Sequence, residues 1–173
     1  MSDRNMRDRI LDAAEARARR GGYNAFSFRE IAQDVGVSSA AVHYHFATKA
    51  ELAQALVARY TEKAMEWLGD PEGLDAGQAS TRVRDLFRDA LTQNDQMCLC
   101  GLLGAERDIL PVDVDAEVAA FFGSLLDYLR TAFRGNAHDT AEAVLAKLEG
   151  AMILARSLRD TAVFDRATAD LAK

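Results

Sequence analysis

At 173 residues, the chain exceeds the usual single domain of about 100 to 150 residues but is short for two full domains. Its composition, 49% hydrophobic and 28% charged, excludes a disordered, collagen-like or low-complexity chain. The net charge of −6 argues against a general polyanion binder. Residues 1–50 nevertheless carry eight Lys or Arg against six Asp or Glu, so the acidic excess belongs to the remaining sequence.

Signals for a membrane span, secretion or a metal site do not stand out in the sequence. No apolar run approaches the roughly 20 residues that cross a bilayer, and the N-terminus leads into a charged amphipathic stretch unlike a signal peptide. Cys98 and Cys100 provide no disulfide framework of the secreted type. His45 and the distant His138 join no cluster of carboxylates or thiols. We therefore expect a cytoplasmic protein without a membrane partner, metal or cofactor.

Apolar residues recur at intervals of three and four, which is typical of helices, and period-two alternation does not persist anywhere. The sequence therefore predicts an all-α chain of about nine helices. In chain order these helices cover about 5–20, a stretch after Ser27, a very short stretch from Ser38, about 48–69, and then about 78–94, 98–109, 114–134, 138–158 and 161–172. Two of the starts are capping boxes, Ser27 with Glu30 and Thr48 with Glu51, in which a hydroxyl three residues before a glutamate caps free amides.

The segment 28–46 has the residue types that two helices crossing over a tight turn require. Ala32 is small where the helices touch, Gly36 follows where the chain turns, and Val37 and Val42 are apolar where the crossing angle is locked. A plain helical hairpin is the alternative. The aromatic- and histidine-rich exit and the newly capped helix that follows favour a helix-turn-helix, whose second helix would enter the major groove of DNA.

At this point the sequence resembles the TetR (tetracycline repressor-like) family of bacterial regulators. The resemblance is carried by Ile10-Leu-x-Ala-Ala14, Gly22, Ser27-Phe-Arg-Glu-Ile-Ala32, Val35-Gly-Val-Ser38, Val42-His-Tyr-His-Phe46 and Thr48-Lys-x-Glu-Leu52. It is close over about the first 60 residues, and later only helix order, helix length and a stretch at 148–155 match. It implies a DNA-binding domain over 1–47 and an effector-binding and dimerisation domain over 48–173, connected by the helix at about 48–69.

The resemblance also implies contacts to double-stranded operator DNA, which we expect to be palindromic. The expected contact residues are Phe28, Arg29, Ser38, Ser39, Ala40, Ala41, His43, Tyr44, His45, Thr48 and Lys49. Serine hydroxyls can donate to phosphates or base edges, alanine methyls can touch thymine, and Tyr44 and Lys49 suit phosphates. The family usually has an aromatic residue at the position of His43 and a Lys or Gly near positions 39 and 40, so the base preference does not carry over.

A single recognition helix contacts few base pairs, so we expect a homodimer that spans two half-sites about 34 to 36 Å apart. The helix at 138–158 is apolar on more than one side, and with the last helix it would form a four-helix bundle across a two-fold axis. A fully buried central helix is the alternative. The expected interface residues are Val144, Leu148, Gly150, Ala151, Leu154, Ala155, Leu158, Phe164, Ala167 and Leu171.

By the same resemblance, a small hydrophobic effector would bind among the helices after residue 60 and release a repressor from its operator. Residues expected to line this pocket are Trp67, Phe87, Leu91, Cys98, Leu102, Leu125, Tyr128 and Met152. For each of them, plain core packing is the alternative role.

Three further hypotheses remain open. Cys98 and Cys100 point about 200° apart on a helix, so they cannot easily share a disulfide or one metal. They are either small hydrophobic residues at the start of a helix or reactive thiols of a repressor that senses oxidants or electrophiles, with Cys98 as the expected sensor. A small all-α enzyme would need a nucleophile, an acid-base pair or a metal cluster, and no spacing supplies one. An interaction protein that keeps the fold without reading DNA is the third hypothesis.

Overall fold

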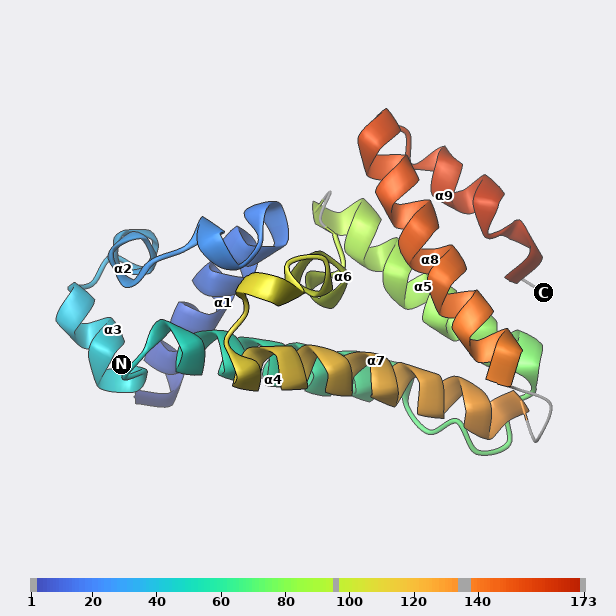
Figure 1. The fold of residues 1–173 in the computed structure, drawn as a ribbon, viewed down its shortest axis with the longest axis horizontal. Coiled ribbons are helices and arrows are strands. Elements are labelled where there is room, and N and C mark those ends of the chain that lie inside the picture. Colours follow the sequence, from blue (N-terminus) through green and yellow to red (C-terminus); the bar gives the residue numbers. More distant parts are fainter. Residues whose placement is uncertain (1–2, 95–96, 134–137, 172–173) are drawn as a thin grey trace. The chain divides into compact units, whose positions relative to one another are not determined.

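The computed structural model describes residues 3–94, 97–133 and 138–171, and over these ranges the chain is helical without strands (Figure 1). Its elements are α1 (Asp3–Gly21), η1 (Tyr23–Ala25), α2 (Phe28–Val35), α3 (Ser39–His45), α4 (Lys49–Leu68), α5 (Ala76–Asn94), α6 (Leu99–Gly104), η2 (Arg107–Ile109), α7 (Val112–Phe133), α8 (His138–Leu158), α9 (Ala162–Ala167) and η3 (Ala169–Leu171), where η marks a 3-10 turn. Over the described ranges, the predicted all-α fold of nine helices is confirmed. None of the described helices combines the length and apolarity that a membrane span requires.

The chain divides into two compact units. The first unit contains Met1–Tyr60 and Leu99–Ala119, and the second contains Thr61–Cys98 and Ala120–Lys173. Helices α4 and α7 each run from one unit into the other, and α6 with η2 belongs to the first unit. The functional boundary expected after residue 47 stays a prediction.

The predicted caps form because each uses a side chain and an amide only three residues apart. The hydroxyl of Ser27 accepts from the Glu30 N–H at 3.3 Å, and that of Thr48 accepts from the Glu51 N–H at 3.1 Å. In addition, Ser38 caps α3 by accepting from the Ala41 N–H at 3.2 Å. Each cap satisfies one of the amides that a helix start leaves without a partner.

Two helices are shorter than the sequence predicts. In place of a helix over 98–109, α6 ends at Gly104, a poor helix former, and the chain continues through η2. In place of a helix over 161–172, α9 ends at Ala167, with the buried Thr168 as its C-cap, and the chain continues through η3. The expected end residues 134 and 172 lie outside the described part of the chain.

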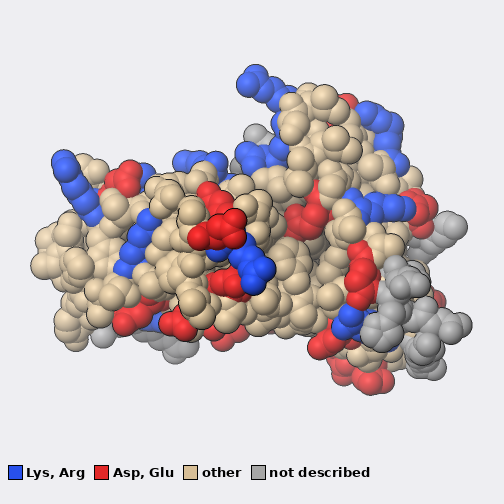
Figure 2. All heavy atoms as spheres, viewed as in Figure 1, with Lys and Arg blue, Asp and Glu red and all other residues tan. Residues whose placement is uncertain are grey.

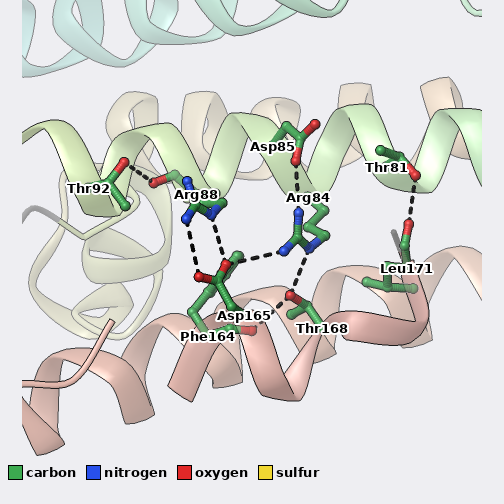
Figure 3. Close-up of polar contacts among 9 residues, drawn as sticks. All are labelled: Thr81, Arg84, Asp85, Arg88, Thr92, Phe164, Asp165, Thr168 and Leu171. Carbon is green, nitrogen blue, oxygen red and sulfur yellow. Dashed lines mark hydrogen bonds and ion pairs between the residues drawn. The ribbon is translucent and has the colours of Figure 1, made fainter. Parts of the chain in front are cut away.

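Polar contacts in the second unit attach α9 to α5 (Figure 3). The carboxylate of Asp165 accepts from the Arg84 guanidinium at 3.2 Å and from the Arg88 guanidinium at 2.7 Å and 3.2 Å. Further along α5, the Thr81 hydroxyl donates to the carbonyl of Leu171 in η3 at 2.7 Å. Charge-assisted pairs of this kind define how α9 and η3 lie along α5, and thereby which side of α9 remains exposed.

Candidate nucleic-acid interface

The turn between α2 and α3 depends on one glycine. Gly36 has φ +76° and ψ 39°, and its N–H and that of Val37 both donate to the Ala32 carbonyl at 2.9 Å. A Cβ at this position would meet nothing within 4 Å, so the backbone angle, rather than crowding, requires glycine here. With Val42 completely buried on the inner side of α3, the crossing of the two helices is fixed from both ends.

The outer side of α3 is exposed and uncharged. Ser38, Ser39, Ala40, His43 and Tyr44 are all exposed, and Tyr44 has 77% of its surface accessible. Figure 2 shows a mainly tan surface at the left edge of the view, below a basic side chain at the upper left. Such a surface can read base edges through hydroxyl, imidazole and methyl groups without a bidentate arginine.

Three further predicted contact residues flank α3, and a fourth is its last residue. Arg29 and Thr48 are exposed, and Thr48 is also the cap of α4. Phe28 is half-buried and packs edge-to-face on His43, with ring centroids 4.4 Å apart. Half-buried His45 packs in the same manner against Tyr44 at 5.2 Å, so aromatic contacts hold both imidazoles in place. Ala41, the remaining predicted contact residue on α3, is half-exposed.

The ammonium group of Lys49, which we expected to face a phosphate, lies against two aromatic rings of the first unit. Its Nζ lies 4.2 Å from the ring centroid of Tyr23 and 4.9 Å from that of Phe26. Burial lowers the pKa of Lys49, while Glu30 and Glu106 partly offset this effect. The side chain is therefore engaged in cation–π contacts within the first unit, and its contact to phosphate stays a prediction.

Glu106 joins this module from the segment after α6, and the sequence reasoning missed it because it lies 83 residues from its partner. Its carboxylate accepts from the Tyr23 backbone N–H at 2.7 Å. A Cβ on Gly22 would come within 2.2 Å of the same carboxylate oxygens. The turn before α2 is thus shaped by a residue that a local motif cannot reveal.

Gly22→Ala is expected to lower the free energy of unfolding by about 2 kcal/mol. Gly22 has φ +76° and ψ −162°, a backbone region that suits glycine, and the new methyl group would also displace Glu106 from the Tyr23 amide. Gly73→Ala is the matched control, because Gly73 has φ +83° but open space around its Cβ. Urea unfolding of both variants measures the difference, and equal losses would contradict a role for the Glu106 contact.

Arginines of α1 hold α2 in the first unit. Arg17 pairs with Glu30 at 3.1 Å and with Asp34 at 2.5 Å, which lowers the pKa of Asp34 through hydrogen bonding and charge. Arg9 donates to the Val35 carbonyl at 2.6 Å, at the C-terminus of α2. These basic side chains are used to position the helix-turn-helix.

The predicted dimer residues fall into two groups. One group is buried within a single chain, so these side chains pack inside the protomer and are not available as surface: Val144, Leu148, Ala151, Ala155 and Phe164. The other group is at least partly exposed: Gly150, Leu154, Leu158, Ala167 and Leu171. Leu154 is 52% exposed, Leu158 64%, and the neighbouring Ile153, which the interface prediction left out, 53%. Helix α8 is therefore apolar both on its inner side and on an exposed strip.

The predicted effector residues are mainly in the second unit, and Leu102 belongs to the first. Trp67 is 49% exposed, whereas the other six residues in the second unit are buried: Phe87, Leu91, Cys98, Leu125, Tyr128 and Met152. Cys98 and Met152 are in direct contact, since the Cys98 N–H donates to the Met152 Sδ at 3.1 Å. The Tyr128 hydroxyl donates to the Leu68 carbonyl at 3.2 Å. A pocket among these side chains stays a prediction.

Comparison with known proteins gives a consistent set of similarities. Residues 10–56 match the family model described as "Bacterial regulatory proteins, tetR family". A crystal structure of a TetR-family transcriptional regulator from Agrobacterium tumefaciens is 31% identical, with a TM-score of 0.89, and the match covers 99% of this chain and 97% of that one. A TetR transcriptional regulator from Legionella pneumophila is 28% identical, with a TM-score of 0.85 and coverage of 99% and 96%.

A curated relative is similar over a shorter stretch. The uncharacterized HTH-type transcriptional regulator YvkB of Bacillus subtilis (strain 168) is 30% identical over 136 residues, or 71% of this chain. That match spans 65% of the relative's own length.

Proposed function

Because the chain belongs to the tetR family of bacterial regulatory proteins, we propose that it is a transcription regulator that binds operator DNA through α3. The single observation that carries the proposal is the exposed, uncharged outer side of α3, held by the Gly36 turn. Family membership also sets the enzyme hypothesis aside, since the relatives described above are named transcriptional regulators.

In this proposal, residues in the first turn of α3 contact base edges, and residues beside that turn contact phosphates of the DNA backbone. The hydroxyl of Ser38 accepts from the Ala41 amide, so its own hydrogen remains able to donate to a phosphate. Ser39 and Ala40 offer a hydroxyl and a methyl group to base edges. The side chain of Tyr44 is long enough to reach a phosphate of the DNA backbone.

Two copies would bind together, each reading one half-site of a palindromic operator. The support is the exposed strip of α8 formed by Ile153, Leu154 and Leu158, with the half-exposed Gly150 on the same helix, together with the exposed Ala167 on α9. Large apolar side chains exposed by half or more, next to small residues, suit a close two-fold contact between helices.

A repressor of this kind would release its operator when a small effector binds the second unit, because effector and DNA then favour different states of the protein. Glu106 supports such coupling within the first unit, since it links the segment after α6 to the turn before α2. A cytoplasmic location is part of the same proposal.

The proposal is tested by fluorescence anisotropy of the full chain with duplexes from the upstream region of its own gene. We expect a subset of duplexes to bind, with an affinity that falls steeply as salt rises from 50 to 200 mM, as phosphate contacts require. Light scattering of the complex should give two chains per duplex. Absence of binding, or an affinity insensitive to salt, would favour the interaction protein instead.

The burial of both cysteines argues against redox sensing, because Cys98 is 2% and Cys100 0% exposed. Burial shields both thiols from oxidants and disfavours the thiolate. Hydrogen peroxide is expected to leave operator binding of the wild-type protein and of Cys98→Ser unchanged in the anisotropy assay. Release of the wild-type protein that Cys98→Ser abolishes would instead establish Cys98 as a sensor.

A further inference from the structure

Helix α8 carries a buried carboxylate whose oxygens make no regular hydrogen bond. Both carboxyl oxygens of Glu149 are inaccessible, and neither accepts a hydrogen bond of ordinary geometry within the described part of the chain. Met152 follows one turn later on α8 and accepts the N–H of Cys98, which brings the Cys98 thiol beside the carboxyl group. Burial raises the pKa of Glu149 to about 7, and the Cys98 thiol lowers it only in part.

The basic side chains that form ion pairs on and around α8 are engaged with other carboxylates. Arg84 and Arg88 of α5 both pair with Asp165 of α9. Arg130 of α7 pairs with Glu142 and Asp127, and Lys147 of α8 pairs with Asp170 at 2.6 Å. Thus, within the described second unit, these ion pairs leave Glu149 without a compensating charge.

An ionised carboxylate in such surroundings is unfavourable, so the protein must either keep it protonated or supply a cation. Core packing alone gives no reason for this residue, because an apolar side chain of similar size would fill the same space without the cost. A buried acid with a raised pKa and no charged partner is instead typical of a binding site.

We propose that Glu149 is the anionic anchor of the effector site and that the effector is a lipophilic cation, of which a protonated aliphatic amine is the simplest example. The inference rests on the proposed function, in which the second unit binds an effector. The ammonium group would donate hydrogen bonds to the two carboxylate oxygens, and the apolar part would contact the thioether of Met152 and the neighbouring buried side chains.

The proposal predicts that amine binding and Glu149 ionisation are linked. In the free protein, the protonated form of Glu149 predominates below about pH 7, and this form competes with the cation. A bound cation favours the carboxylate, so binding releases a proton to solvent. Amine affinity should therefore fall by about tenfold for each pH unit below 7 and level off above it.

Decylamine, decanol and decanoate form a matched probe series for the full chain, with binding followed by titration calorimetry. At pH 7.5, decylamine is expected to bind the wild-type protein at least about tenfold more tightly than decanol, and decanoate most weakly. Glu149→Gln should abolish the preference for the amine while it retains decanol binding. Glu66→Gln, at an exposed acid of α4 in the same unit, is the control and should keep the preference.

A second measurement does not depend on any variant. The carboxyl carbon of Glu149, observed by NMR in the wild-type protein, should titrate near pH 7 and shift to a lower pKa when decylamine is added. An amine preference that survives in Glu149→Gln, or decanol binding as tightly as decylamine, would overturn the proposal. Operator binding without amine preference would refute this inference alone, whereas amine preference without operator binding would refute the proposed function alone.

Discussion

The double substitution Leu154→Glu and Leu158→Glu is expected to convert the dimer into a monomer and to weaken operator binding by about 100-fold or more. Both side chains are more than half exposed on α8, where the proposed two-fold contact lies. Pairing would place four carboxylates in one desolvated contact, each facing like charges from the other copy. A monomer then holds a single half-site and loses the affinity that two linked half-sites provide.

Light scattering and anisotropy measure the two effects separately. Ile109→Glu combined with Val112→Glu is the matched control, because these apolar residues are 52% and 83% exposed but belong to the first unit, whereas α8 belongs to the second. The control protein should remain dimeric. If the α8 variant also remains dimeric at micromolar concentration, the exposed strip is not the contact between copies.

Ala40→Glu is expected to reduce operator affinity by about 100-fold or more while it leaves the fold unchanged. Ala40 is exposed in the first turn of α3, so a longer side chain meets no neighbour in the free protein. On DNA, the added carboxylate would enter a groove flanked by phosphates and would lose its hydration there. The free energy of unfolding should change by no more than about 0.5 kcal/mol.

Anisotropy with an upstream duplex and urea unfolding provide the two readouts for this variant. Ala76→Glu carries the same charge change at an exposed position of α5 and should bind the operator like the wild-type protein. Wild-type affinity of Ala40→Glu would mean that the first turn of α3 does not face the DNA.

Much of the helix-turn-helix was predictable because its determinants are local. The hydroxyls of Ser27 and Thr48 cap amides three residues away, and Gly36 supplies a backbone angle that its own lack of a Cβ permits. Such interactions need no distant partner, so their spacing in the sequence is sufficient to predict them.

The Glu106 and Glu149 contacts could not be predicted in the same way. Glu106 reaches a backbone amide 83 residues away, and Glu149 meets Cys98, which lies in the segment before α6. Nothing in the flanking residues of either glutamate distinguishes it from an exposed acid, since the signal is burial, and burial depends on which elements pack together.

By itself, the sequence determined the all-α class, the helix starts and the residues that shape the α2–α3 turn, because hydrogen bonds between residues three or four apart encode them. Only the tertiary structure decided which apolar strip of α8 is interior. Helical periodicity identifies both the Val144–Leu148–Ala155 strip and the Leu154–Leu158 strip, and packing within the second unit buries the first and leaves the second exposed. The same holds for the end of α9. The sequence pattern continues the helix to 172, but it ends before Thr168, whose buried hydroxyl accepts from Arg84 of α5 at 3.0 Å.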